Sequence, residues 1–304
     1  MADKHTIITD KYLVKPGTKV SLKDYDTEYN DDVFFKGNIL EKADGQKILD
    51  EEKEKLAVMQ EKLYAYNQYS VLIIFQAMDA AGKDGAVKHI MSGINPAGVK
   101  VHSFKTPSSN ELEHDYFWRH YIALPPRGEV GIFNRSHYEN VLITRVHPEY
   151  IMNEHLPGIN NIKDINDEFW QKRFKQIKRF EKNISQNGTI VLKFFLHISK
   201  KEQKKRFIER IDNPKKNWKI SPADSKERNF WKDYQFAYEE AIRNTSTEYA
   251  PWFIIPADDK WFTRLAIGVI IQKQFEKLNL EYPKVSDKTL AELKVIREQL
   301  MNES

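Results

Sequence analysis

The chain has 304 residues, enough to bury the core of one large α/β domain or two small ones, and its 40% hydrophobic and 30% charged residues exclude an intrinsically disordered chain. It has no cysteine, which excludes disulfides, thiolate metal sites and a thiol nucleophile, and neither a membrane-spanning run nor a secretory signal is visible, so we expect a cytoplasmic protein without a membrane partner. The net charge of +4 and the pI near 8.8 suit an anionic partner. The pI is below the value above about 9 that is typical of nucleic-acid-binding domains, so we expect no nucleic-acid partner.

Residues 1–45 are polar and interrupted by Pro16, Gly17 and Gly37, and we expect an arm on the surface of the domain. Helical spacing of apolar residues over 46–66 predicts an amphipathic helix, and the continuous apolar run at 71–75 is typical of a strand buried on both faces. Similar runs return at 99–104, 130–133, 189–196 and 252–255, with helical segments between them. This alternation predicts an α/β fold with a mainly parallel sheet of about five strands and helices on both faces, over residues 46–283.

Two further segments have distinct patterns. Residues 147–167 are rich in Pro, Gly, Asn and His, and the helix predicted over 167–186 carries aromatic residues on one side and lysines on the other. We interpret the region 145–186 as a helical lid, with a plain packing helix as the alternative for 167–186. The tail, 284–304, has leucines and an isoleucine at helical spacing, and we expect it to pack on the domain or on a second subunit.

The segment that follows the first buried strand carries the main chemical signal. It reads QAMDAAGKDG over residues 76–85 and leads into a helical sequence. A strand, a loop of small residues ending in Gly-Lys and then a helix is the P-loop (Walker A) arrangement, in which backbone N–H groups bind phosphate. The candidate phosphate-binding residues are Ala80, Ala81, Gly82, Lys83, Asp84, Gly85 and, on the helix, Lys88.

This loop departs from the standard P-loop. Ala77 replaces the first Gly, and Asp84 replaces the Ser or Thr whose hydroxyl usually holds Mg²⁺. Asp79 and Asp84 would repel phosphate unless a divalent cation lay between them, so we predict Asp79 as a ligand of Mg²⁺ and Asp84 as a weaker candidate. The alternative is that both acids cap the following helix.

A second motif, GIFNRSHYEN over residues 131–140, follows the third buried strand. The carboxyl ends of parallel strands face the ligand crevice, so we expect Asn134 and Arg135 to lie opposite the P-loop. Arg135 would neutralise charge on the transferring group, while Asn134 and Glu139 would orient the metal or its waters. The alternative is a helix cap at Asn134 and a surface acid at Glu139.

A third segment, SKKEQKKRFIER over residues 199–210, is basic. Arg206 and Arg210 fall on one helical face, and we expect both to contact phosphate because guanidinium groups match phosphate oxygens. The lysines of this segment fit a solvated face better. Arg173, in the predicted lid, is a further candidate for a basic channel.

Taken together, these motifs resemble the family-2 polyphosphate kinases. The resemblance covers about residues 56–274 and rests on residues 79–85, 133–136, 199–206 and 217–219, and on the Thr245-Ser-Thr, Ala250-Pro-Trp252 and Asp258-Asp-Lys260 stretches. It implies a three-layer α/β/α P-loop kinase fold with a lid, and transfer of a phosphoryl group between polyphosphate and a nucleotide with Mg²⁺, or Mn²⁺ as an alternative. By position, Asp79 resembles the catalytic metal-binding aspartate, Lys83 the phosphate-binding lysine, Arg135 the arginine beside the second motif, and Arg206 a phosphate contact. We expect these four residues and Asn134 to be the catalytic residues.

The resemblance also bears on substrate and assembly. Many relatives have Asp where this chain has Asn134, and Asn134 with Glu139 is similar to the subgroup that phosphorylates both nucleoside mono- and diphosphates. Relatives form homo-oligomers, so we expect one here. Two alternatives remain open: an ATP-dependent nucleoside monophosphate kinase, and a non-catalytic module that binds polyanions or RNA.

Overall fold

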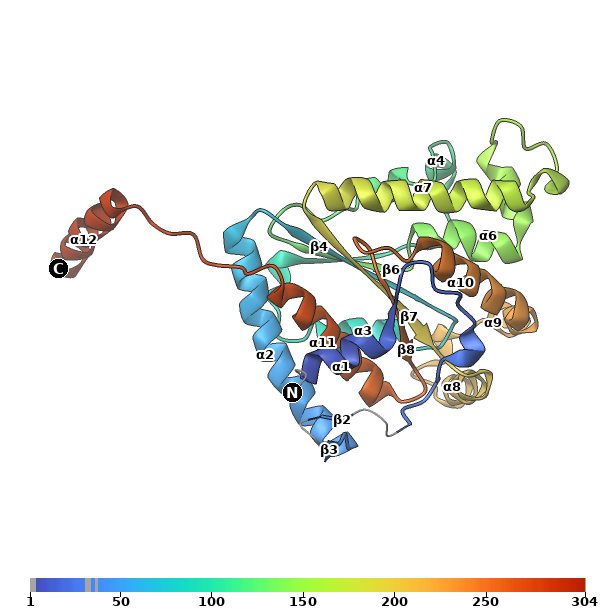
Figure 1. Ribbon diagram of the computed structural model, residues 1–304, viewed down its shortest axis with the longest axis horizontal. Helices are drawn as coiled ribbons and strands as arrows, with labels where there is room; N and C mark the ends of the chain where they lie inside the picture. Colours follow the sequence, from blue (N-terminus) through green and yellow to red (C-terminus); the bar gives the residue numbers. More distant parts are fainter. Residues whose placement is uncertain (1–3, 31–33, 36–37, 304) are drawn as a thin grey trace.

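The computed structural model describes residues 4–30, 34–35 and 38–303, and its centre is one six-stranded sheet (Figure 1). The strands in spatial order are β1 (Leu13–Val14), β8 (Trp252–Pro256), β7 (Thr189–His197), β4 (Ser70–Ala77), β6 (Val130–Asn134) and β5 (Val99–Ser103). The five strands from β4 to β8 are parallel, as predicted, and every residue of β4 is buried. A separate hairpin joins β2 (Phe34–Phe35) and β3 (Asn38–Ile39).

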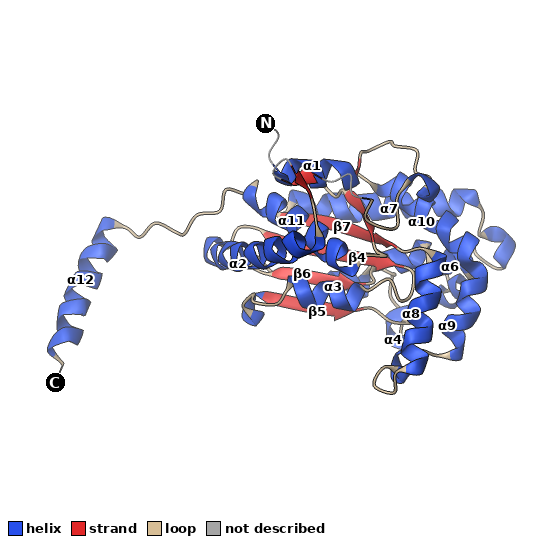
Figure 2. Ribbon diagram, turned by 90° about the horizontal axis from the view of Figure 1, so that it is seen from below, coloured by secondary structure: helices blue, strands red, loops and turns tan. Residues whose placement is uncertain are grey.

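Helices cover both faces of the sheet, which gives three layers (Figures 1 and 2). One layer contains α1 (Lys4–Tyr12), α2 (Lys42–Tyr66), α3 (Lys83–Ile90) and α11 (Lys260–Glu276), and the other contains α6 (Ile143–Val146), α7 (Asp167–Gln186) and α10 (Trp231–Thr245). The remaining α-helices are α4 (Ser109–Leu112), α5 (Trp118–Tyr121), α8 (Lys200–Asp212), α9 (Pro222–Glu227) and α12 (Asp287–Asn302). Short 3₁₀ helices are η1 (Leu22–Asp24), η2 (Pro96–Gly98), η3 (His137–Val141), η4 (Pro148–Glu154), η5 (Ile162–Asp164), η6 (Asn217–Lys219) and η7 (Arg228–Phe230). The predicted α/β/α architecture is confirmed.

The N-terminal segment is more deeply integrated than a surface arm. Ile8, Val14 and Leu22 are buried in the core, and β1 pairs antiparallel with β8 as a sixth strand. The prediction of five strands missed β1 because a two-residue strand has no detectable alternation. Helix α2 begins at Lys42, four residues before the predicted start, and ends where Asn67 adopts a left-handed conformation.

Helix α7 has the predicted bounds, and its apolar face is packed inward. Its side chains Trp170, Phe174, Ile177, Phe180 and Ile184 are buried, and the helix contacts β7 and α10. This arrangement corresponds to the packing helix that the sequence left as an alternative. A lid that opens and closes over residues 145–186 stays a prediction.

Helix α12 lies apart from the rest of the chain at the end of an extended segment (Figures 1 and 2). No residue of α12 is buried, and its apolar side chains Leu290, Leu293, Ile296 and Leu300 are 46–61% exposed. The expected packing of this helix on its own domain is therefore not observed. Among the described residues, no helix is both long and apolar enough to span a bilayer.

Candidate active site

The P-loop connects β4 to α3 at the carboxyl edge of the sheet. Ala80 and Gly82 have positive φ values of 63° and 109°, which turn the chain so that α3 begins at Lys83. The N-terminus of a helix presents free N–H groups and a partial positive charge, which suit phosphate. Lys83 Nζ donates to the Ala77 carbonyl at 2.8 Å, which holds the ammonium over the loop.

The second motif meets the P-loop because β4 and β6 are neighbouring parallel strands, with Phe75 paired to Asn134. Arg135 Nη2 lies 3.0 Å from Asp79 Oδ1, and Asn134 Nδ2 donates to Asp84 Oδ1 at 2.7 Å. Asp79 and Arg135 are 35% and 40% exposed, so both remain accessible to a ligand. The structure thus brings together the two motifs that the sequence placed on opposite sides of a crevice.

Charges in this cluster perturb one another. Burial, followed by the nearby Arg135 cation, lowers the pKa of Lys83 to about 8, against the opposing pull of Asp79, Glu139 and Asp84. Burial also raises the pKa of Glu139, while Arg135 and Lys83 counter that shift. Groups with perturbed pKa values that share a crevice are typical of catalytic sites.

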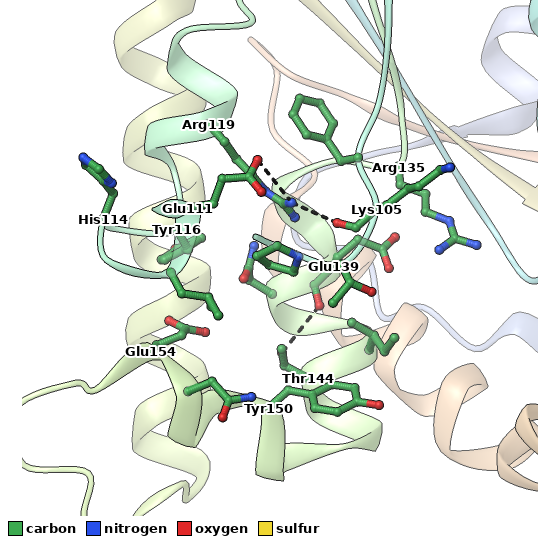
Figure 3. Close-up of a pocket in the computed structure, with 17 residues that line it drawn as sticks. Lys105, Glu111, His114, Tyr116, Arg119, Arg135, Glu139, Thr144, Tyr150 and Glu154 are labelled. Atoms are coloured by element: carbon green, nitrogen blue, oxygen red, sulfur yellow. Dashed lines mark hydrogen bonds and ion pairs between the residues drawn. The ribbon is translucent and has the colours of Figure 1, made fainter. Parts of the chain in front are cut away.

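A cavity of about 250 Å³ opens beside Arg135 and Glu139 (Figure 3). Its walls combine aromatic and apolar side chains with polar groups; they include Phe104, Leu112, Tyr116, Ile143, Tyr150, Thr144, Asn153 and Glu154. Arg119 also lines it, donating to the Lys105 carbonyl at 2.9 Å and lying 3.8 Å from Glu111. A concave site that combines apolar and aromatic surface with polar groups is typical of a small-molecule pocket.

This cavity was not predicted from the sequence. Phe104 to Pro107 directly follow β5, so the rule for carboxyl ends of parallel strands would have found that wall. Arg264 was also missed; its Nη2 lies 3.7 Å from the position that a Cβ on Gly85 would occupy, so it adds a cation beside the P-loop. No sequence pattern singles out Arg119 or Arg264.

Arg206 does not have the predicted position for a phosphate contact. It is 4% exposed, and all five of its N–H groups point to protein acceptors: the carbonyls of Ala80, Ala81, Ala257 and Asp258, and the Glu202 carboxylate. The guanidinium therefore ties the P-loop to the segment after β8. Gln203 supports the same loop by donating to the Asp79 carbonyl at 2.9 Å.

Two other predicted phosphate ligands are also engaged elsewhere. Arg173 is 2% exposed, donates to Glu154 and lies with its guanidinium 4.1 Å from the Tyr116 ring centre, so it supports the wall of the cavity from behind. Arg210 donates to the Lys219 carbonyl at 3.3 Å, one helical turn beyond Arg206. Lys88, by contrast, is exposed on α3.

The acidic groups do not form a complete metal cage. Among the described residues, no three His, Asp or Glu side chains converge as metal ligands. Mg²⁺ usually keeps several waters and takes only one or two carboxylates together with substrate phosphates, so the pair of Asp79 and Asp84 at a phosphate-binding loop fits that ion.

A P-loop with Arg135 of the second motif beside it is typical of P-loop phosphotransferases, and comparisons with known proteins identify the family within this class. Residues 39–283 match the family model "Polyphosphate kinase 2 (PPK2)", so the chain belongs to this family. It is 46% identical to an ADP-polyphosphate phosphotransferase of Rhodopseudomonas palustris, covering 97% of this chain and 99% of that protein. It is 44% identical to an AMP/ADP-polyphosphate phosphotransferase of Meiothermus ruber, covering 90% and 95%.

A solved structure is similar over nearly the whole length. The crystal structure of polyphosphate kinase 2 from Arthrobacter aurescens TC1 is 36% identical, has a TM-score of 0.86, and covers 98% of this chain and 99% of that one. This similarity supports the three-layer kinase fold described above.

Proposed function

We propose that this chain transfers a phosphoryl group between inorganic polyphosphate and a nucleoside mono- or diphosphate, in either direction. The observation that carries the proposal is that Lys83 and Asp79 of the P-loop interact with Arg135, which lines the cavity. Names of the similar proteins support polyphosphate as donor and AMP or ADP as acceptor.

The two substrates would occupy different parts of the site. The cavity suits the nucleoside of the acceptor, because Phe104, Leu112 and Tyr150 offer apolar and aromatic surface to a base. The polymer would lie across the P-loop, where Lys88 and Arg264 add positive charge. The reacting phosphates would then meet between Lys83 and Arg135.

The reaction needs no protein nucleophile. An oxygen of the nucleotide's terminal phosphate attacks the terminal phosphorus of polyphosphate, a new P–O bond forms, and the P–O bond to the rest of the polymer breaks. Lys83 and Arg135 offset the negative charge that develops on the transferring group and on the leaving oxygen. The reverse reaction uses the same groups in the opposite order.

We assign Mg²⁺, with Mn²⁺ as a substitute, to the acidic side of this site. Asp79 would bind the ion, and Asn134 and Glu139 would orient it or its waters, while substrate phosphates complete the shell. When bound, the ion supplies charge neutralisation between the carboxylates and the polyphosphate. Many relatives have an Asp where this chain has Asn134, which donates to Asp84 here. Because Asn134 with Glu139 resembles the subgroup that acts on both nucleoside mono- and diphosphates, we propose that both AMP and ADP are acceptors.

The function is tested by supplying AMP or ADP with Mg²⁺ and either long-chain polyphosphate or ATP as the only donor, and separating the nucleotide products. We expect ADP and ATP to form with polyphosphate. Product from AMP with ATP alone would instead indicate the nucleoside monophosphate kinase, and binding of polyphosphate without any product would indicate the non-catalytic module.

The lowered pKa of Lys83 predicts a pH limit. Lys83 is useful as a cation, so kcat/KM should be constant below the folded-state pKa and fall as the pH rises through about 8. In a Lys83→Arg variant the group stays charged, so this decline should move to higher pH even if the rate is lower. A decline at the same pH in both proteins would show that another group titrates.

We also propose that α12 joins copies of this chain. An isolated helix of 16 residues is only marginally stable in water. We therefore expect the exposed apolar side chains of α12 to pack against a partner helix. With Leu293 and Leu300 at heptad position a and Ile296 at d, Glu292 falls at g and Arg297 at the following e position. In parallel helices these two positions face each other across the seam, so the charges of two copies are complementary.

Charge exchange tests this pairing. Glu292→Arg or Arg297→Glu alone should weaken self-association in sedimentation experiments at several protein concentrations, whereas the double exchange should restore it. A double variant that associates no better than the single variants would reject pairing between copies of α12.

A further inference from the structure

A buried ion pair links α7 to the central sheet behind the active site. Lys193 of β7 and Glu181 of α7 are both fully buried, and Lys193 Nζ lies 2.7 Å from Glu181 Oε2. The other two protons of the ammonium group go to the Tyr138 hydroxyl at 2.9 Å and to the Thr245 carbonyl at 2.8 Å. All three donors of the lysine are therefore satisfied inside the protein.

Tyr138 is the junction of this network. Its hydroxyl accepts from Lys193 and lies 2.8 Å from Glu181 Oε1 and 2.9 Å from Thr245 Oγ1, to one of which it donates its proton. Trp252 Nε1 donates to the same Thr245 Oγ1 at 2.9 Å. The network thus joins η3 to β7, β8, α7 and α10 through fixed hydrogen bonds.

The segment that Tyr138 anchors carries site residues on both sides. Arg135 lies three residues before Tyr138 and has a φ of 63°, a left-handed conformation that is strained for a residue with a Cβ. Glu139 follows Tyr138 directly. At the other end of the segment, Ser136 Oγ accepts from Gln76 of β4 at 3.2 Å and also from the Tyr138 N–H. The strained turn is therefore held by one polar anchor at Ser136 and another at Tyr138.

Stability alone does not account for this network. Burying two charges costs desolvation energy that their attraction only roughly offsets, and well-packed apolar residues often serve equally well. Compared with apolar packing, directional hydrogen bonds fix the position of the group that they bind more closely. Here the held group is the ring of Tyr138, and through the backbone it sets the positions of Arg135 and Glu139.

We propose that Lys193, Glu181 and Tyr138 are positioning residues for phosphoryl transfer, which act by holding Arg135 and Glu139 in line with Lys83 and Asp79. The proposal rests on the function proposed above. None of the three side chains touches the substrate; their effect passes through the η3 backbone.

Tyr138→Phe is the direct test, because it keeps the ring and removes only the hydroxyl. We expect a cooperatively melting protein whose kcat with polyphosphate and ADP falls by about tenfold or more, while the KM for ADP changes by less than about threefold. The matched control is Tyr249→Phe, which also removes a hydroxyl that bonds to α7, at the Lys178 carbonyl, but has no hydrogen bond to η3. It should keep the kcat of the unmodified protein.

A second variant tests whether the hydrogen bonds of the network are needed when its two buried charges are removed together. Replacing Lys193 and Glu181 together by Leu leaves no unpaired buried charge, so the protein should fold, and we expect kcat to fall as in Tyr138→Phe. Normal kcat in both Tyr138→Phe and the double variant would overturn the proposal and leave the network a purely structural role. If the unmodified protein itself made no nucleotide product from polyphosphate, the proposed function would fail instead, which is a distinguishable result.

Discussion

Replacing Lys83 by Met should reduce turnover with polyphosphate by about 10³-fold while leaving a folded protein, because one preorganised cation at a developing charge contributes about two to three orders of magnitude in rate. Methionine keeps much of the aliphatic length of the side chain, so the packing beside the loop is largely preserved. The loss should lie mainly in kcat, since the charge on the transferring group is greatest in the transition state. Steady-state kinetics and thermal melting measure both parts.

Lys88→Met provides the control on the same helix. Lys88 is exposed on α3, beyond the phosphate-binding loop itself. We therefore expect kcat within about threefold of that of the unmodified protein, and a larger effect on the affinity for polyphosphate at low salt. Equal losses in the two variants would mean that general positive charge, and not the position of Lys83, explains the activity.

Arg206→Met should destabilise the protein by about 3–5 kcal/mol, because four carbonyl groups lose their Arg206 donor, whereas the Glu202 carboxylate keeps Lys205, at 3.4 Å, as its ion-pair partner. Turnover should fall as well, since the P-loop carbonyls at Ala80 and Ala81 lose the group that holds them. The midpoint and slope of denaturant unfolding give the change in the free energy of unfolding.

Arg210→Met is the matched control for this prediction. The partly exposed Arg210 side chain donates to the Lys219 carbonyl at the surface, so its replacement should change the free energy of unfolding by no more than about 0.5 kcal/mol. If Arg206→Met unfolded with the same free energy as the unmodified protein and lost only activity, Arg206 would be a phosphate ligand and the structural role assigned to it would be wrong.

The layered fold was predictable because its signals are local. Five short segments rich in apolar residues marked the parallel strands, and the order of strand, small-residue loop and helix placed Lys83 at the start of α3. Adjacent parallel strands bring their carboxyl ends together, so the position of Asn134 and Arg135 opposite the P-loop also followed from the sequence, whereas the ion pair of Arg135 with Asp79 did not.

The partners of the buried charged side chains depend on tertiary contacts, which the spacing of residues in the sequence does not predict. Arg206 and Arg210 share a helical face, yet only the structure shows that the loop carbonyls occupy every donor of Arg206. Arg173 was a basic residue on an amphipathic helix, and its ion pair with Glu154 joins residues 19 positions apart. The Lys193–Glu181–Tyr138 network joins three separate elements, and Lys193 stands between apolar residues of β7, where no pattern predicts its partners.

The most direct test follows the transferred phosphorus itself. Polyphosphate carrying radiolabelled phosphorus is incubated with unlabelled ADP, Mg²⁺ and the protein, and the nucleotides are separated from orthophosphate. We expect the label in the terminal phosphate of ATP, and its rate of appearance should be about 10³-fold lower when Lys83 is replaced by Met. Labelled orthophosphate with unlabelled nucleotides would show hydrolysis of the polymer and would contradict transfer at this site.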